Sequence, residues 1–244
     1  MSEWICPLPW DTAFFGFKIG RINPRQLEPL TVSSNLAHAQ RAGFQCLYFE
    51  AAPHDATTVE LAERYGFHLV DVRVVLEQGL DLQSGRPSRS RVASPSVSTG
   101  PYRPEDIASL EEIAVEIGHL SRFQFDNNFP ADAQRRLYRA WLHKSIADES
   151  GALIVAYENG VVAGLITCEN TDGLGRIILI GVRSHFRGHG VAEALVQASL
   201  DWFRSQGSRR VQVITQVRNV PAQRLYQKMG FLTHSVTLMY HRWL

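Results

Sequence analysis

Residues 176–192 read Arg-Ile-Ile-Leu-Ile-Gly-Val-Arg-Ser-His-Phe-Arg-Gly-His-Gly-Val-Ala. The first seven, 176–182, are almost all apolar and rich in β-branched residues, which predicts a buried strand. Glycines at 188 and 190 follow, and an apolar helical pattern begins at Val191. Glycine permits positive φ and close backbone approach, and the free N–H groups of a helix's first turn favour anions. The stretch therefore predicts a strand that leads into an anion-binding helix start, with Arg187 adding a positive charge.

Two common nucleotide-binding motifs do not fit this stretch. A Walker loop needs Gly-Lys-Ser/Thr, but the chain has Gly190-Val191-Ala192. A Rossmann fingerprint needs a third glycine at 193, where Glu193 stands. The residues alone leave open whether the turn binds an anion or only connects a strand to a surface helix.

A second informative stretch, 219–231, follows downstream. Asn219 and Pro221 are typical of a helix start and Gly230 of a helix end. Ala222, Leu225, Tyr226 and Met229 recur at helical spacing, so they share one face. By spacing alone, Tyr226 is expected to be a core tyrosine rather than a catalytic one.

Together the two stretches resemble the GNAT acetyltransferase superfamily over about residues 99–244. The family's acetyl-CoA loop, Arg/Gln-x-x-Gly-x-Gly/Ala, is matched by Arg187, Gly190 and Ala192. The resemblance implies an α/β fold with a mixed, mostly antiparallel sheet flanked by helices, and acetyl-CoA as cosubstrate. The later signature of the family is matched by Asn219, Ala222, Leu225, Tyr226, Gly230 and Phe231.

The resemblance also implies roles for individual residues. The pantetheine arm is expected along the strand backbone, the pyrophosphate on residues 187–192, and Asn219 beside the arm. Tyr226 is expected to act as general acid for the leaving thiolate, because a phenol and an alkyl thiol have similar pKa values. Gly181 is expected to mark a bulge that opens the strand. The residues assigned to acetyl-CoA are Ile180, Val182, Arg187, Gly188, His189, Gly190, Val191, Ala192, Asn219 and Leu225.

The general base stays open between three alternatives. The acceptor amine must lose a proton, and Asp71, Glu169 or solvent could take it. His185 and His189 flank Arg187 and are expected to face phosphate and solvent, so neither is assigned as a base. Acidic or cysteine partners at ligand spacing are lacking, so no metal is expected.

Composition predicts an ordinary soluble enzyme. The chain has 244 residues, is 45% hydrophobic and carries a formal net charge of +1. Its basic residues are scattered, which argues against a nucleic-acid partner. Three widely spaced cysteines fit reduced thiols in a cytoplasm rather than a disulfide framework. Neither a signal peptide nor a membrane span is expected.

The N-terminal part repeats the order of elements found near the C-terminus. Helices are expected at 30–42 and 57–65 and strands at 18–22, 46–51 and 68–76. Gly66-Phe67 and Gly230-Phe231 lie 164 residues apart (230 − 66). Residues 1–77 are therefore predicted as a smaller α/β domain, a degenerate half of the same fold, although helix-Gly-Phe-strand units also recur by chance. The Ser/Pro/Gly/Arg-rich segment 78–98 is predicted as a linker.

The remaining expectations concern residues 99–244. Asn159-Gly160 predicts a two-residue β-turn. Helices are expected at 105–117, 135–146 and 191–203, and strands at 152–157, 161–169, 211–216 and 233–242. A dimer is expected by resemblance only.

Shorter motifs resemble the dTDP-fucosamine acetyltransferases, which acetylate the amine of a nucleotide-linked 4-amino-4,6-dideoxygalactose. They are Trp-Asp-Thr-x-Phe-Phe-Gly at 10–16, Gly-Phe-x-Leu-Val-Asp at 66–71, Ser-Arg-Phe at 121–123 followed by Phe-Pro at 129–130, and Leu-Tyr-x-x-Trp at 137–141. A nucleotide-activated amino sugar is the leading acceptor. The alternatives are another amine, such as a peptide N-terminus, small molecule or antibiotic, and a non-catalytic acyl-CoA-binding protein. The residues expected to bind the acceptor are Phe14, Phe15, Ser121, Arg122 and Phe123.

Overall fold

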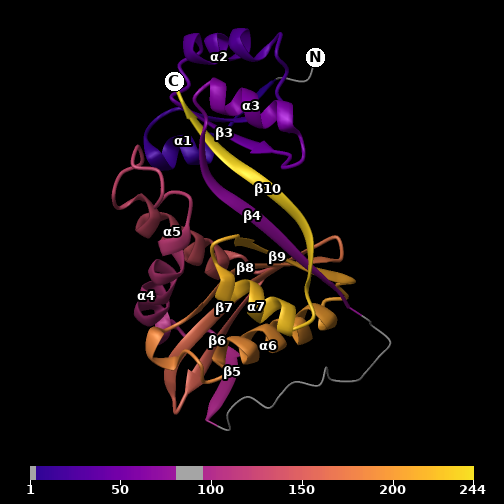
Figure 1. The fold of residues 1–244 in the computed structure, drawn as a ribbon. Helices are drawn as coiled ribbons and strands as arrows, with labels where there is room; N and C mark the ends of the chain where they lie inside the picture. The colour runs from indigo at the N-terminus through magenta and orange to yellow at the C-terminus, as the bar shows by residue number, and fades with distance from the viewer. Residues whose placement is uncertain (1–3, 81–95) are drawn as a thin grey trace.

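The computed structural model describes residues 4–80 and 96–244. Their ten strands form one sheet in the order β1-β2-β3-β10-β4-β9-β8-β7-β6-β5 (Figure 1). Two neighbouring pairs, β2/β3 and β8/β9, are parallel, and the other pairs are antiparallel. The strands are β1 (Ile5–Pro7), β2 (Ile19–Ile22), β3 (Cys46–Ala51), β4 (His68–Gly79), β5 (Val97–Pro101), β6 (Ala152–Glu158), β7 (Val161–Thr171), β8 (Leu174–Val182), β9 (Arg210–Gln216) and β10 (Leu232–Trp243).

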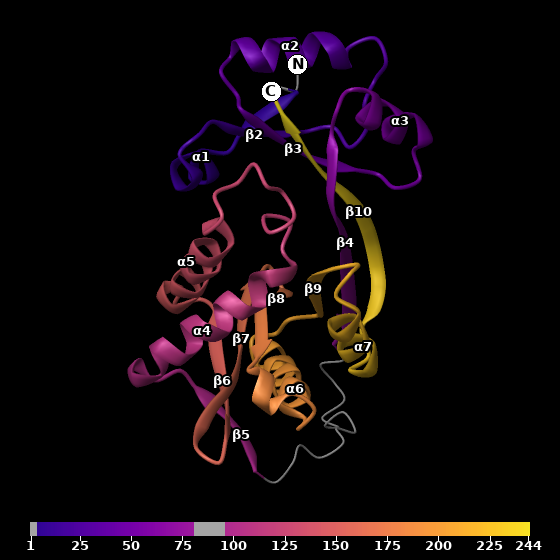
Figure 2. The same ribbon diagram turned by 60° about the vertical axis from the view of Figure 1, so that its left-hand side comes forward.

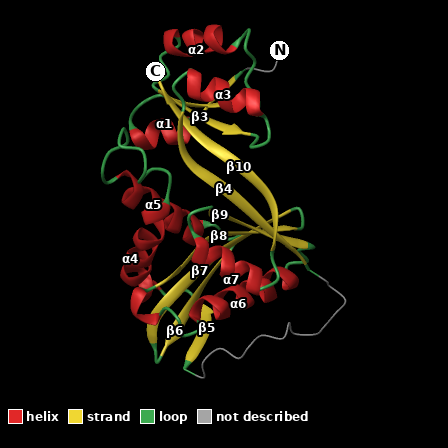
Figure 3. Cartoon of the chain, viewed as in Figure 1, coloured by secondary structure: helices red, strands yellow, loops and turns green. Residues whose placement is uncertain are grey.

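Seven α-helices of the described residues surround this sheet (Figures 2 and 3). One core cluster lies under α4 and α5 and the aromatic residues of the loop between them. A second packs α6 and α7 on the sheet, and a third packs α2 and α3. The helices are α1 (Pro9–Phe15), α2 (Val32–Arg41), α3 (Ala56–Arg64), α4 (Ile107–Ile117), α5 (Ala133–Ala147), α6 (Val191–Ser205) and α7 (Val220–Lys228). The mixed, mostly antiparallel α/β architecture predicted from the sequence is confirmed.

Most predicted elements are present, with differences at their ends. The expected hairpin turn is confirmed, since Asn159 and Gly160 have φ of 51° and 81°. The helix α1 at Pro9–Phe15 is not among the elements expected from the sequence; Pro9 starts it, and Gly16 ends it with φ of 82°. Both ends of the segment expected as a linker are strand, in β4 and β5. Residues 81–95 of that segment lie outside the described residues.

Two adjacent strands near the middle of the sheet, β4 and β10, come from distant parts of the chain. The two strands pair with each other. On its other side, β10 pairs with β3 of the N-terminal part, and β4 pairs with β9 of the C-terminal part. Figures 1 and 2 show the pair connecting the part of the molecule with α2 and α3 to the part with α7. The last strand of each part therefore completes the sheet of the other part.

The register of this pair follows the 164-residue offset seen in the sequence. Arg73 lies opposite Thr237, and these two residues are 164 apart. Each strand has one bulge, which leaves Val70 of β4 and His234 of β10 unpaired, again 164 apart. The central strands and their bulges are thus related by an approximate twofold axis between Arg73 and Thr237. We propose from this geometry that residues 1–77 are a degenerate copy of the later part.

Candidate active site

The site begins where the parallel strands β8 and β9 separate. Their pairing runs from Leu174↔Arg210 to Ile177↔Val213 and then stops. Over residues 178–182 the edge of β8 that faces β9 is therefore free of a neighbouring strand. Peptide N–H and C=O groups on such an edge are available to an extended ligand.

The expected bulge lies three residues earlier than Gly181. Thr167 pairs with Leu179 and Cys168 with Ile177, so Ile178 is the extra residue of β8. Gly181 serves close packing instead, because a Cβ there would lie 2.7 Å from Ile113 and 2.6 Å from Ile117 of α4. The expectation of a bulge at Gly181 was wrong, since the glycine is required by the helix above it.

Two cavities lie where β8 and β9 have separated, since Ile180 of β8 lines both. The larger has a volume of about 510 Å³ and the smaller about 360 Å³. Both are lined by the same central residues of α4, β8 and α7, so they meet between those elements. The shared residues are Ile117, Ile180, Asn219, Ala222 and Tyr226.

The smaller cavity contains part of the predicted acetyl-CoA site. Gly188 and Gly190 both have φ of +84°, and no side chain caps the N-terminus of α6. Its first-turn N–H groups are therefore available to an anion. The predicted residues that line the smaller cavity are Ile180, Val182, Arg187, Ala192, Asn219 and Leu225.

The other residues assigned to this loop do not line either cavity. Val191 is buried in the core under α6. His189 points to Glu158, with 2.9 Å between Nδ1 and Oε2. Arg187 is ion-paired with Glu116 of α4. These contacts hold the loop in place, and the peptide N–H groups at the start of α6 are available to a ligand.

Helix α7 brings Asn219 and Tyr226 to the junction of the cavities. Asn219 is the N-cap, and its side-chain oxygen accepts from the N–H of Ala222 at 3.3 Å. Tyr226 is 2% exposed and lies two turns along the helix. Burial raises the pKa of its phenol, so the group keeps its proton at neutral pH. Tyr226 is both a core residue, as its spacing predicted, and a residue of both cavities.

The larger cavity contains both carboxylates considered as bases, Asp71 and Glu169. Asp71 is 6% exposed, and burial raises its pKa although the Arg218 guanidinium opposes this. Its Oδ1 accepts from the N–H of Val72 at 2.8 Å and lies 3.6 Å from Nη2 of Arg218. Glu169 comes from β7, on the other side of the opening.

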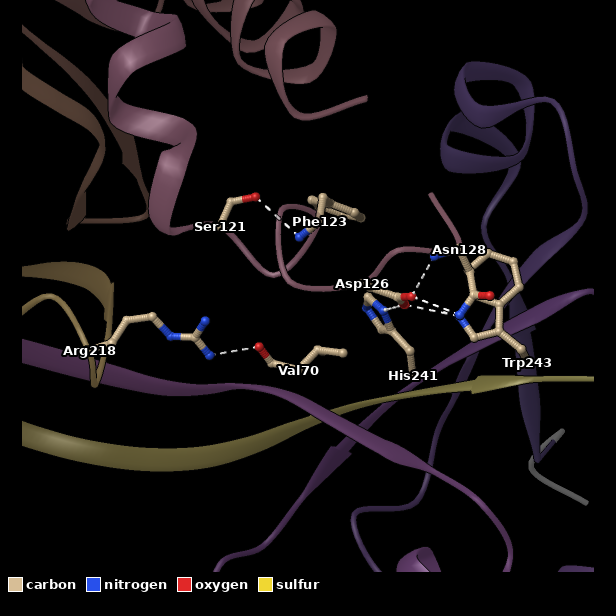
Figure 4. Close-up of polar contacts among 8 residues, drawn as sticks. All are labelled: Val70, Ser121, Phe123, Asp126, Asn128, Arg218, His241 and Trp243. Carbon is tan, nitrogen blue, oxygen red and sulfur yellow. Dashed lines mark hydrogen bonds and ion pairs between the residues drawn. The ribbon is translucent and has the colours of Figure 1, made fainter. Parts of the chain in front are cut away.

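Arg218 explains how the bulge in β4 is tolerated. The bulge leaves the Val70 carbonyl without a ladder partner, and Nη2 of Arg218 donates to it at 2.8 Å (Figure 4). The same guanidinium lies 3.8 Å from the centre of the Phe125 ring. Arg218 therefore connects the bulge, Asp71 and the loop between α4 and α5.

The residues predicted to bind the acceptor separate into two groups. Ser121, Arg122 and Phe123 line the larger cavity. Phe14 and Phe15 line neither cavity. Phe15 is buried, and its ring centre lies 5.2 Å from that of Phe123, while Phe14 stacks on Trp10. The structure therefore places α1 behind the cavity wall.

One cluster was missed by the sequence reasoning. Asp126 accepts from Nδ1 of His241 at 2.6 Å and from Nε1 of Trp243 at 2.9 Å (Figure 4). Its other oxygen accepts from the backbone N–H and the side-chain amide of Asn128. These bonds fasten the α4–α5 loop to β10. No local signal could reveal them, because Asp126 and His241 are 115 residues apart.

Burial and these hydrogen bonds shift both pKa values. Burial lowers the pKa of His241 to about 4, so the ring is neutral at pH 7. Burial alone would raise the pKa of Asp126, but the hydrogen bonds from His241, Trp243 and Asn128 lower it to about 2. The pair is therefore a carboxylate that holds a neutral imidazole.

Other cavity residues were also absent from the predicted site. Arg73 of β4 and Lys144 of α5 belong to no motif, whereas Tyr138 and Trp141 belong to the Leu-Tyr-x-x-Trp motif at 137–141. The aromatic and charged members are Arg73, Tyr138, Trp141 and Lys144.

No group of three or more His, Cys, Asp or Glu side chains within the described ranges could hold a metal ion. Within the same ranges, no helix is long and apolar enough to cross a membrane. The expected dimer stays a prediction.

Comparison with known proteins gives consistent results. Residues 114–231 match the model of the acetyltransferase (GNAT) family. The chain is 25% identical to the dTDP-fucosamine acetyltransferase of Escherichia coli O6:H1 over 239 residues, 97% of this chain and 96% of that protein. It is 29% identical to the spore coat polysaccharide biosynthesis protein SpsD of Bacillus subtilis over 64% of this chain, but spans only about half (54%) of that protein.

A solved structure shows the same fold over nearly the whole chain. The GCN5-related N-acetyltransferase from Sphaerobacter thermophilus aligns with a TM-score of 0.69 at 19% identity. The alignment covers 98% of this chain and 76% of that one. The likeness therefore includes the N-terminal part as well as the segment that matches the family model.

Proposed function

We propose that the chain, whose residues 114–231 match the acetyltransferase (GNAT) family, transfers the acetyl group of acetyl-CoA to the amine of a nucleotide-activated amino sugar. The acceptor is of the dTDP-4-amino-4,6-dideoxyhexose type. The observation that carries the proposal is the meeting of two cavities at Tyr226. One cavity leads to the glycine loop and the other to a charged, aromatic pocket, as direct transfer between two bound substrates requires.

Acetyl-CoA fits the smaller cavity and the open edge of β8. The pyrophosphate would take the N–H groups around Gly190, at the uncapped start of α6. The pantetheine arm would bond to the strand edge near Ile180 and Val182. A peptide N–H of that edge could also hold the oxyanion that forms at the thioester carbon, a contact worth about 3 kcal/mol in other enzymes.

The transfer needs a base and an acid on opposite sides of the reacting carbon. The neutral amine attacks the thioester carbon, the C–S bond breaks, and the thiolate takes the phenolic proton of Tyr226. The amine's proton passes directly or through water to Asp71 or Glu169. Burial of Asp71 raises its pKa, which brings the group closer to the range of an effective general base.

The larger cavity suits a nucleotide-linked sugar. Phe123, Tyr138 and Trp141 supply aromatic surface, and Arg122 and Lys144 supply positive charge. A volume of about 510 Å³ lies in the range of small-molecule sites. The name of the Escherichia coli relative, which aligns over 97% of this chain, supports the same acceptor class.

Thermal denaturation with ligands tests the proposal. A ligand at a hundred times its dissociation constant adds about 2.7 kcal/mol of stability. We expect acetyl-CoA to raise the melting temperature and one dTDP-amino sugar to raise it further. If acetyl-CoA alone stabilises the chain, the acceptor is another amine, and if acetyl-CoA gives no rise, the assignment of the loop is wrong.

A further inference from the structure

Arg122 lies in the wall of the larger cavity with its guanidinium over two aromatic rings. Its Cζ is 4.4 Å from the centre of the Tyr48 ring and 4.8 Å from that of Phe123. A guanidinium that stacks on rings uses its flat face and leaves its N–H groups free at the edge. Those N–H groups can therefore serve a ligand in the cavity.

Arg122 also differs from the nearby Arg73 and Arg218, because each of those lies within ion-pair distance of a carboxylate. Arg73 is ion-paired with Glu50 at 3.1 Å, and Arg218 lies 3.6 Å from Asp71. Among the described residues, no carboxylate lies within ion-pair distance of Arg122. Its charge opposes the burial that raises the pKa of Asp71 and of Asp11, so both carboxylates are nearby without pairing with it. A half-buried cation of this kind has capacity for an anion.

The two rings beside Arg122, Tyr48 and Phe123, both pack against His241. The Tyr48 ring lies 4.8 Å from that of His241, and the Phe123 ring lies 6.1 Å from it. His241 is itself held by Asp126. The Tyr48 hydroxyl is also buried, and the Asp11 carboxylate lies near it. Such a preorganised site loses little entropy when a ligand binds.

We propose that Arg122 binds a phosphate group of the acceptor, with Lys144 as a second cation at the cavity rim. Lys144 lines the same cavity and makes no ion pair within the described part of the chain. The planar fork of arginine bonds two phosphate oxygens at once, and lysine adds a point charge. The inference rests on the proposed function, since it assigns the same cavity to the acceptor. It predicts that the enzyme selects amines that carry a phosphate or diphosphate.

Binding of dTDP, which has no amine, tests this site apart from catalysis. Isothermal titration is carried out with coenzyme A at saturation, so that its own pyrophosphate site is filled. Arg122→Gln should weaken dTDP about 10- to 100-fold, the effect of losing a charge-assisted hydrogen bond. Arg122→Lys should recover part of the loss. Thymidine, which lacks the phosphates, should bind the wild type and Arg122→Gln equally weakly.

Arg103→Gln is the matched control. Arg103 also lies over an aromatic ring, 4.9 Å from the centre of Tyr157, and lines neither cavity. Its replacement should leave the affinity for dTDP unchanged. Wild-type affinity in Arg122→Gln, or no dTDP binding by the wild type, would overturn the inference.

Turnover assays separate this inference from the proposed function. The Michaelis constant for a dTDP-amino sugar should rise in Arg122→Gln, while that for acetyl-CoA stays the same. If dTDP binds through Arg122 but no amino sugar is acetylated, the anion site stands and the proposed function fails. If an amino sugar is acetylated with an unchanged Michaelis constant in Arg122→Gln, the function stands and the inference fails.

Discussion

Replacing His241 by asparagine should remove much of the pH dependence of stability between pH 4 and 6.5. The His241 pKa is about 4 in the folded chain against 6.5 for an ordinary histidine. Between these values the unfolded chain binds a proton that the folded chain does not. The free energy of unfolding is therefore fully retained above pH 6.5 and falls as the pH drops toward 4.

The size of the effect follows from the difference of about 2.5 between the two pKa values. Each pKa unit corresponds to about 1.4 kcal/mol, so the wild type should lose about 3.5 kcal/mol over this range. Asp126 adds a second decline at lower pH, because its pKa falls from 3.8 to about 2 on folding. Its contribution, about 2 kcal/mol, is present above pH 3.8 and lost as the pH falls through 2.

Urea denaturation at a series of pH values, followed by tryptophan fluorescence, measures how the free energy of unfolding falls in each of the two pH ranges. Asparagine at 241 can still donate to Asp126 but does not titrate. The control is His38→Asn, which makes the same substitution at an exposed residue of α2 and should leave the wild-type curve unchanged. The reasoning is refuted if His241→Asn keeps the full decline between pH 6.5 and 4.

Three further predictions concern the two cavities. Tyr226→Phe should lower kcat about a hundredfold or more while the acetyl-CoA Michaelis constant stays the same, because the change removes only the proton donor. Steady-state kinetics measures both constants. An unchanged kcat would exclude Tyr226 as the acid. Asp71→Asn should abolish the acidic limb of the pH–rate profile while Glu169→Gln keeps it, and the reverse result would identify Glu169 as the base. Gly181→Ala should cost about 1–3 kcal/mol in urea denaturation by forcing its Cβ against Ile113 and Ile117, whereas Gly100→Ala, with no atom within 4 Å, should be neutral.

The sequence predicts the elements well where local chemistry determines them. The strand at 46–51 was predicted with its observed limits, and Gly190 ends the glycine turn at the start of α6 as expected. Helix α1 was missed because its aromatic residues have no clear polar face, and Pro9 was not interpreted as a helix start. Local signals also fail for the bulge at Ile178, since its place depends on pairing with β7.

The other features that were not predicted from the sequence depend on contacts between residues far apart in the chain. The 164-residue offset suggested a repeat, but the exchange of β4 and β10 depends on which strands pair across the chain. That exchange carries Asp71 and Arg73 into the larger cavity. The contact of Asp126 with His241 likewise exists only after β10 has joined β3. The acceptor side of the site was therefore harder to predict than the glycine loop.

The most direct test of the account is acetyl transfer itself. The chain is incubated with acetyl-CoA and dTDP-4-amino-4,6-dideoxygalactose, and the nucleotide sugar is analysed by mass spectrometry while free thiol is measured. The account predicts an N-acetylated nucleotide sugar formed in step with free coenzyme A, and formation of both about a hundredfold or more slower in Tyr226→Phe. An unmodified sugar, under conditions in which acetyl-CoA stabilises the chain, would contradict the proposed acceptor.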